Sequence, residues 1–442
     1  MASLKDSEIK DIQKAVFELI QQGELEDAAN VVAPLLENDP NDAIALNFLG
    51  IIHLELHNFH LAYQYLRRAL QEKVNIAPVW VNFGLAAHEL GRNEEALNAY
   101  LKSGEIDNEY VKAYVNAAAL FIEESKWDDA KKACEIALQI DPESSMAKKN
   151  LAHVHLAKHE WTQGWKYWEL SLGNKYRKEW SYGTEKRWDG SKNQAVVIYG
   201  EQGLGDEIMY ASVIPDAIND CKKVIIDCDP KLKKLFKRSF PKADVHGTRR
   251  DSKPYWLADA RIDARCAISS LPGFYRNKDE DFPGVPYLKA DPELVRMWKG
   301  LFAEWKKPVY GLCLHGGSKL TGESWRKLEP EDFSPLFALD AIFISLDYKG
   351  TLNHPKIREF QWATQFSDYD ITASLIASLD ACIGVNTTAM LCADALGITT
   401  HTLIPTKHDW RHEGKSLWSK SNNSYLQEKG ESWRDVVKRV KL

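Results

Sequence analysis

The chain has 442 residues, of which 44% are hydrophobic, and a formal net charge of −6. This length and hydrophobic content allow two or three folded cores and exclude a largely disordered chain. Residues 1–160 carry 15 Lys and Arg against 26 Asp and Glu, a net charge of −11, which leaves +5 for residues 161–442. The acidic first part argues against nucleic-acid binding there, and the mildly basic remainder suits an anionic ligand.

Seven cysteines are scattered through the chain without a Cys-x-x-Cys pair. This pattern predicts reduced cysteines within hydrophobic cores. The first ten residues are polar, and no apolar run reaches the roughly 18 residues that a membrane span needs. We therefore expect a cytoplasmic protein without a transmembrane segment.

Small residues recur in the first part at a constant interval of 34 residues: Ala28, Ala62, Ala96, Ala130 and Gly164. A second series recurs at 35, 34 and 34 residues: Asn47, Asn82, Asn116 and Asn150. This period is typical of tetratricopeptide repeats. We predict an α-helical solenoid over residues 1–172, with helix pairs near 7–38, 42–73, 76–107, 110–141 and 144–172.

The last of these units is unusually aromatic, with Trp161, Trp165, Tyr167 and Trp168 at the positions that small and aliphatic residues usually occupy. An aromatic terminal unit is better suited to packing against a neighbouring domain than to facing water. We expect residues 173–194 to form an ordered connector.

From residue 195 the pattern changes to short apolar runs that alternate with helical segments, which predicts parallel sheets. The runs expected to form strands are AVVIYG, KVIIDCD and ADVHG, and then VYGLCLHGG, AIFISLD, ACIGVN and THTLIP. Two such sets, at 195–306 and 307–442, predict two facing Rossmann-like lobes. Ligands of such sheets lie beyond the carboxyl ends of the strands. The expected lining is 200–207, 315–327, 347–350, 384–390 and 405–411. The basic segment 231–238 is interpreted as the solvated face of an amphipathic helix, not as a nucleic-acid surface.

The first glycine-rich segment is GEQGLGDEIMY at 200–210. Gly203 and Gly205 let the backbone approach a ligand, and the helix that follows supplies free N–H groups. Asp206 has two interpretations. It either caps this helix or, facing a cleft, serves as a general base for an incoming hydroxyl.

The segment 314–333 ends a strand with two glycines, and basic residues follow closely. Gly317 and Ser318 with Arg326 and Lys327 have the chemistry that a diphosphate requires, since backbone nests and Arg or Lys charges bind phosphate. The alternative is a solvated loop.

A third segment, 382–397, places Asn386, Thr387 and Thr388 between a strand and a helix. Threonine hydroxyls and first-turn amides form an anion site, although plain N-capping explains the same residues. In the segment 403–418, His408 and His412 do not have the spacing of zinc ligands, so no metal is expected.

These motifs in order, GEQGLGDEIMYASVIPDA, GVNTTAMLCADALG and HDWRHEGKSLW, resemble the repeat-bearing bacterial glycosyltransferases related to the ADP-heptose:lipopolysaccharide heptosyltransferases. The likeness covers most of 160–440. It implies a GT-B fold, in which two Rossmann-like lobes close on a nucleotide-diphosphate sugar without a metal or other cofactor.

The resemblance also implies roles. Asp206 would deprotonate the acceptor hydroxyl, while Ser318, Arg326 and Lys327 neutralise the diphosphate. The turn at Thr387, Thr388 and Ala389 would hold the diphosphate by its amides. His408, Asp409 and Arg411 are candidate donor-side residues. Two positions depart from the family pattern: Asn386 replaces an acid and Leu391 a histidine.

The sequence therefore predicts a glycosyltransferase whose repeats select a protein or glycan acceptor. The alternative is a non-catalytic adaptor, in which the repeats bind a partner and the α/β region is a degenerate transferase.

Overall fold

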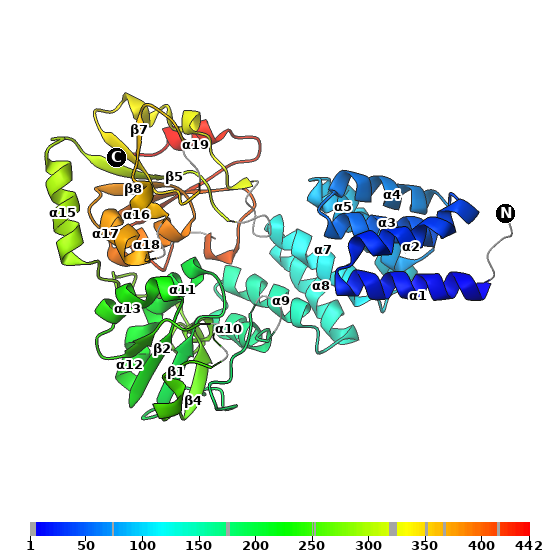
Figure 1. Ribbon diagram of the computed structural model, residues 1–442, viewed down its shortest axis with the longest axis horizontal. Coiled ribbons are helices and arrows are strands. Elements are labelled where there is room, and N and C mark those ends of the chain that lie inside the picture. Colours follow the sequence, from blue (N-terminus) through cyan, green and yellow to red (C-terminus); the bar gives the residue numbers. More distant parts are fainter. Residues whose placement is uncertain are drawn as a thin grey trace. The chain divides into compact units, whose positions relative to one another are not determined.

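The computed structural model describes residues 6–72, 75–173, 177–249, 251, 253–317, 325–349, 352–365, 368–412 and 416–442 (Figure 1). The chain divides into two compact units, Met1–Val154 and His155–Leu442. The boundary falls inside the helix Ser145–Ala157, before residue 172, where the solenoid was predicted to end. Ser318, one of the expected diphosphate-binding residues, lies outside the described residues.

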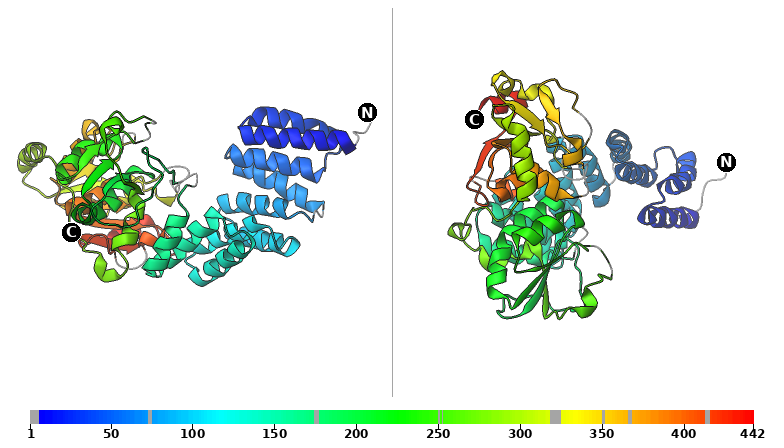
Figure 2. Two further views of the ribbon diagram at one scale, coloured as in Figure 1. Left: turned by 90° about the horizontal axis from the view of Figure 1, so that it is seen from below. Right: turned by 60° about the vertical axis from the view of Figure 1, so that its left-hand side comes forward.

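The first unit is a stack of paired helices (Figure 2). They are α1 (Asp6–Gln22), α2 (Leu25–Asn38), α3 (Ala43–Glu55), α4 (Phe59–Gln71), α5 (Ala77–Glu89), α6 (Asn93–Ile106), α7 (Val111–Glu123), α8 (Trp127–Ile140) and α9 (Ser145–Ala157), whose last residues belong to the second unit. A Cβ added at Gly50 of α3 would lie 2.4 Å from Leu66 of α4, so this pair approaches too closely for a larger residue. The repeating alanines at 28, 62, 96 and 130 are fully buried, which confirms the predicted helix pairs.

The aromatic helix α10 (Trp161–Leu170) packs against the α/β part of the second unit, as expected. Its three tryptophans are buried, and each indole N–H donates a hydrogen bond. The acceptors are Asp279 Oδ1 for Trp161 at 2.7 Å, the Arg276 carbonyl for Trp165 at 2.6 Å and Ser269 Oγ for Trp168 at 3.0 Å.

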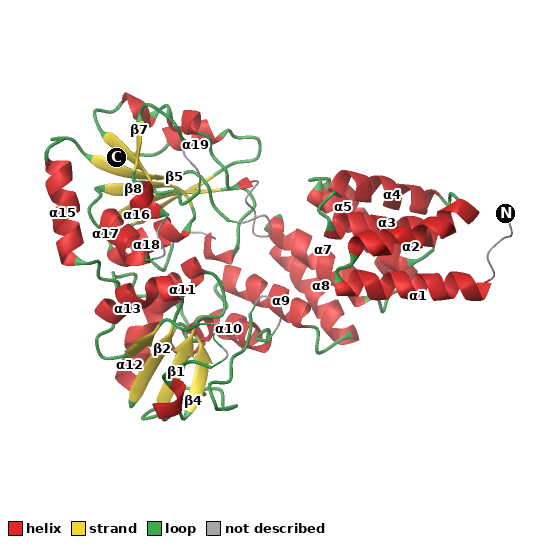
Figure 3. Cartoon of the chain, viewed as in Figure 1, coloured by secondary structure: helices red, strands yellow, loops and turns green. Residues whose placement is uncertain are grey.

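The second unit contains two separate parallel sheets (Figure 3). The first has the order β3-β2-β1-β4, formed by β1 (Ala195–Tyr199), β2 (Lys223–Asp227), β3 (Asp244–His246) and β4 (Ala264–Ala267). Its helices are α11 (Leu204–Tyr210), α12 (Ile214–Asp220), α13 (Lys233–Ser239) and α14 (Pro272–Tyr275). The apolar runs predicted β1, β2 and β3. β4 was not predicted, because its sequence ARCA contains the charged Arg265, which is buried and pairs with Glu179 at 2.6 Å.

The second sheet has the order β10-β9-β8-β5-β6-β7. Its strands are β5 (Val309–Cys313), β6 (Ile342–Ser345), β7 (Ile357–Glu359), β8 (Ala381–Val385), β9 (Thr399–Ile404) and β10 (Asn422–Leu426). Its helices are α15 (Pro292–Ala303), α16 (Gln361–Thr364), α17 (Tyr369–Ile376), α18 (Thr388–Leu396) and α19 (Trp433–Lys438). The edge strands β7 and β10 were not predicted, since IRE and NNSYL lack an apolar run.

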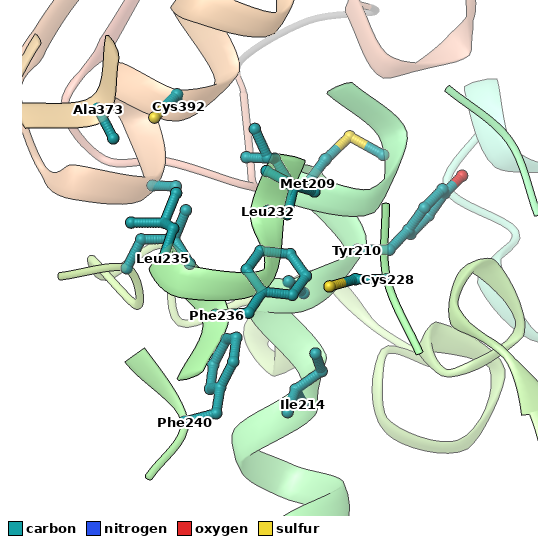
Figure 4. Close-up of a cluster of buried hydrophobic side chains, with 14 of the residues drawn as sticks. Met209, Tyr210, Ile214, Cys228, Leu232, Leu235, Phe236, Phe240, Ala373 and Cys392 are labelled. Atoms are coloured by element: carbon teal, nitrogen blue, oxygen red, sulfur yellow. The ribbon is translucent and has the colours of Figure 1, made fainter. Parts of the chain in front are cut away.

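The helices that flank the first sheet and those that flank the second pack into one hydrophobic core. Leu235 of α13 lies beside Ala373 of α17 and Cys392 of α18 (Figure 4). The basic segment 231–238 is a short 3-10 turn followed by α13, and its interpretation as a solvated face needs correction at one residue. Arg238 makes two hydrogen bonds of 2.6 Å to Asp370, so its charge joins the two halves of the unit.

Candidate functional site

The loops after β1 and β8 meet where helices α11 and α18 begin. A Cβ added at Gly205 would lie 3.1 Å from Leu391 Cδ1 and 3.3 Å from Thr388 Oγ1. Only a glycine fits this approach without displacing its neighbours. Leu391, which stands where the resembling family has a histidine, fills this contact with an apolar side chain.

Asp206 lies at this junction, in the first turn of α11. Its Oδ2 accepts a hydrogen bond from the Gly203 N–H at 3.1 Å, which is a helix-capping contact. Its Oδ1 accepts from Nη1 of Arg411 at 2.6 Å. The capping interpretation is therefore confirmed, and the same carboxylate also forms an ion pair with a residue that follows the distant strand β9.

Arg411 joins Asp206 to a second acid. Its Nε donates to Asp409 Oδ2 at 2.9 Å, and its Nη2 donates to the same oxygen. Burial opposes the charged form of Arg411, but Asp409 and Asp206 outweigh burial and hold its pKa above the ordinary value. The pairing keeps this guanidinium charged at a partly buried position.

Arg326 brings a second guanidinium to the cluster. Its Nη1 donates to the backbone carbonyl of Asn386 at 3.4 Å. Burial lowers the pKa of Arg326, and the nearby positive charge of Arg411 lowers it further, while Asp409 and Asp206 act in the opposite direction. We call Asp206, Arg326, Asp409 and Arg411 the charge cluster.

The start of α18 borders the charge cluster. Thr387 is the N-cap, and its side chain accepts from the Met390 N–H at 3.3 Å. Thr388 and Ala389 begin the helix, whose first-turn amides provide partial positive charge. Capping by Thr387 is confirmed. Anion binding by these amides stays a prediction.

Asn386 contacts a residue that sequence reasoning did not select. Its Nδ2 donates to Nε2 of His412 at 2.8 Å. Burial lowers the pKa of His412 to about 4, although Asp409 partly opposes this shift. His412 is therefore neutral at pH 7, with Nε2 as the hydrogen-bond acceptor. Nearby, the ring of His408 hydrogen-bonds through Nδ1 to the Pro405 carbonyl at 3.2 Å.

Not every expected residue joins the charge cluster. Lys327 is exposed, and its Nζ pairs instead with Glu329 Oε1 at 2.7 Å. Gly317, with φ of +84°, is the last described residue before the segment that contains Ser318. A diphosphate role for Lys327 thus has less geometric support than one for Arg326.

A second histidine that sequence reasoning missed follows β5. His315 Nδ1 donates to Asp347 Oδ2 at 2.9 Å, while Asp347 Oδ1 accepts from the N–H groups of Leu314 and His315. The only sequence signal was that both residues lie in segments expected to line the cleft, 315–327 and 347–350.

Beneath the first loop, Glu207 is fully buried and pairs with Arg249. Its Oε2 accepts from the Asp229 N–H at 2.9 Å. Burial raises the pKa of Glu207 to about 8, although Arg249 acts in the opposite direction. A Cβ added at Gly200 would lie 2.2 Å from the Glu207 carboxyl carbon, so this acid occupies the space that a larger residue at 200 would need.

A further buried ion pair lies between the connector and the first loop. Arg177 Nε is 3.5 Å from Glu201 Oε1, and both side chains are almost completely buried. Arg177 also contacts the carbonyl of Trp168 and, at 3.0 Å, Ser171 Oγ. This arginine therefore ties the end of α10 to the loop that precedes α11, the helix that carries Asp206.

Within the described residues, no group of three or more His, Cys, Asp and Glu side chains is placed to hold a metal ion. None of the helices in that part of the chain combines the length and the apolar character needed to cross a membrane.

Two family models, both described as tetratricopeptide repeats, match residues 18–75 and 77–110. Protein FlbA of Caulobacter vibrioides is 25% identical over 433 residues, which cover 91% of this chain and 72% of that protein. Solved structures similar to the chain include PilF of Pseudomonas aeruginosa, with 23% identity over 38% of this chain and 76% of that one and a TM-score of 0.36. Another is MamA, with 19% identity over 35% and 90% of the two chains and a TM-score of 0.32.

The chain thus carries tetratricopeptide repeats followed by an α/β domain with two parallel sheets. Repeats of this kind support a role in protein interaction, because stacked helix pairs create an extended binding surface.

Proposed function

We propose that the α/β domain is a glycosyltransferase that moves a sugar from a nucleotide-diphosphate donor to an acceptor hydroxyl. The observation that carries this proposal is the convergence of the charge cluster with the start of α18. It places two guanidinium groups, a helix N-terminus and a carboxylate together. The guanidinium groups and the helix N-terminus would bind a diphosphate, and the carboxylate would accept the proton of an acceptor hydroxyl.

The strand orders support a nucleotide ligand at this place. Counted in chain order within the second sheet, its strands lie as 6-5-4-1-2-3, the arrangement of doubly wound sheets. The order reverses between β5 and β8, and in the first sheet it reverses between β1 and β4. Ligands of doubly wound sheets bind at these reversals, beyond the carboxyl ends of the strands. The loops after β1, β5 and β8 occupy those ends, which agrees with a GT-B arrangement.

In the proposed reaction, Asp206 accepts the proton of the acceptor hydroxyl, and the hydroxyl oxygen forms a bond to the anomeric carbon of the donor. The bond between that carbon and the phosphate oxygen breaks, and the nucleoside diphosphate leaves with the electron pair. Arg326, Arg411 and the first amides of α18 stabilise the charge of the leaving group.

A second candidate is a non-catalytic adaptor, and one observation favours it. Both oxygens of Asp206 are already engaged, by Gly203 and by Arg411. In this alternative the charge cluster only holds α11 against the segment after β9, and the repeats perform the function.

A thermal-shift screen of the whole chain against ADP, GDP, UDP, CDP, CMP and their sugar conjugates separates the two candidates. A ligand that binds the folded state raises its melting temperature by mass action. The proposal expects a selective shift that Arg326→Met reduces strongly and Lys327→Met reduces little. An unchanged melting temperature with every nucleotide would support the adaptor.

The acceptor side of the proposal rests on the repeats. We propose that they bind a protein acceptor, since a stack of helix pairs offers a long surface for an extended peptide. The test is transfer to a candidate acceptor by the full chain with and without a competing repeat fragment. Transfer that the fragment does not inhibit would contradict this role.

A further inference from the structure

The ion pair of Asp206 and Arg411 conflicts with the use of Asp206 as a base. The Arg411 Nη1 group that donates a 2.6 Å hydrogen bond to Asp206 Oδ1 occupies one of the positions from which an acceptor hydroxyl could donate to that oxygen. The other oxygen is held by the Gly203 N–H. In the structure, Arg411 and Gly203 therefore partly mask Asp206.

The charge cluster is also poorly prepared for an anion. Arg326 and Arg411 contribute two positive charges, and Asp206 and Asp409 contribute two negative charges, so the formal sum is zero. A diphosphate brings at least two further negative charges to a partly buried site, where uncompensated charge is unfavourable. Diphosphate binding is favoured if one guanidinium leaves a carboxylate of the cluster and pairs with the ligand instead.

The geometry of Arg411 suits such an exchange. Its Nε and Nη2 both contact Asp409, whereas Nη1 alone contacts Asp206. A small rotation about the Asp409 contact would move Nη1 away from Asp206 and keep the guanidinium paired. Asp206 would keep its orientation, since its Oδ2 remains bound to Gly203.

We propose that Arg411 is a positioning residue that masks Asp206 in the free protein and transfers its Nη1 to the diphosphate when the ligand binds. The exchange frees Oδ1 of Asp206 at the time when the donor is in place. This inference rests on the proposed function, and it adds an order of events: the donor binds before Asp206 can accept a proton. No bond other than hydrogen bonds changes in this step.

The test is a double-mutant cycle on diphosphate affinity, measured by calorimetry with ADP, GDP, UDP and CDP on the full chain. Asp206→Asn removes the carboxylate charge that competes for Arg411, so affinity should rise about 3-fold to 10-fold. Arg411→Met should lower affinity about 10-fold or more, because a charge-assisted hydrogen bond is lost. Adding Asp206→Asn to Arg411→Met should bring a clearly smaller gain, because only the general effect of removing a negative charge remains.

A conservative variant and two surface variants test whether the affinity changes come only from a disturbed structure. Arg411→Lys keeps the charge but lacks the fork, and should recover part of the affinity without restoring the full effect of Asp206→Asn. The controls Arg296→Met and Asp340→Asn, at exposed ion pairs, should leave affinity unchanged. If Arg411→Met does not fold, the gain in Asp206→Asn and its reduction in Arg411→Lys still decide the question.

The outcomes separate this inference from the proposed function. Diphosphate binding that Asp206→Asn leaves unchanged or weakens would overturn the exchange alone. A gain of the same size in the Arg411→Met background would also overturn it, since the gain would then not depend on Arg411. Failure of every diphosphate to bind the unaltered chain would overturn the proposed function and the exchange together.

Discussion

Trp410, next to Arg411 in the segment after β9, packs edge-on against Trp165 of α10, with ring centroids 5.6 Å apart. The same Trp165 donates its indole N–H to the carbonyl of Arg276 at 2.6 Å. One side chain of α10 therefore contacts both the segment of Arg411 and the segment after β4. Helix α10 therefore helps to hold the charge cluster in place.

Trp165→Phe should lower the stability of the second unit by about 1–2 kcal/mol, because the hydrogen bond to Arg276 and part of the ring contact are lost. Chemical denaturation followed by fluorescence measures the change. Trp362→Phe is the matched control, because Trp362 is half exposed and should cost less. Equal effects of the two variants would contradict a supporting role for Trp165.

Arg177→Met should be strongly destabilising, by about 3–5 kcal/mol, because it leaves the buried Glu201 carboxylate with only neutral hydrogen-bond donors, Ser269 and Gln202. The double variant Arg177→Met with Glu201→Met removes both charges and should be more stable than the single variant. Urea midpoints of the three proteins measure this. A double variant less stable than Arg177→Met would show that the pair does not act through its charges.

Gly200→Ala should destabilise the protein by about 1–3 kcal/mol, because its Cβ meets the Glu207 carboxyl group. The control is Gly300→Ala within α15, where an added Cβ meets nothing within 4 Å. There the change should stabilise by about 0.5–1 kcal/mol, since alanine is the better helix former. The two melting temperatures should move in opposite directions.

Asn386→Asp should raise the pKa of His412 from its low value of about 4, because a carboxylate beside Nε2 favours the protonated ring. NMR titration of ring-labelled histidine, with His412→Gln to assign the signal, measures the shift. In the unaltered chain the folded state favours neutral His412, so its contribution to stability is complete above about pH 6.5 and declines as pH falls towards 4. A variant whose His412 still titrates near 4 would contradict this account.

Thiol reactivity should distinguish Cys221 from the other cysteines. All seven are free thiols, and all except the half-buried Cys221 are buried. Burial raises the pKa of Cys221 to about 11, so even this thiol should react slowly near neutral pH. Ellman's reagent should modify about one thiol per native chain and seven after unfolding in guanidinium chloride. Cys221→Ser should remove the native reaction.

The repeat unit could be predicted almost completely, because its helix pairs depend on residues close in sequence. The small residue at each 34-residue interval is buried in the structure as the period requires. The strands that were missed depend on distant partners. β4 contains Arg265, whose burial becomes acceptable only because Glu179 in the connector pairs with it.

For the candidate site, the sequence identified the loops but not their contacts. Glycines and polar residues after apolar runs indicated the segments of Asp206, Arg326 and Asn386. Nothing local indicated that Arg411 would bind a carboxylate 205 positions earlier in the chain. The contact of His412 with Asn386 and the pairing of Arg177 with Glu201 were not predicted for the same reason, since they come from burial and from distant partners.

The tryptophans of α10 have a consequence for synthesis on the ribosome. Their hydrogen-bond partners lie 118, 111 and 101 residues further along the chain. The repeats can fold from local contacts as they emerge, whereas these three indoles remain without partners until the first sheet has been translated. During that interval the nascent chain presents an apolar surface that a chaperone can cover. A fragment that ends near residue 172 would keep this surface exposed permanently and should self-associate more than one that ends near residue 154.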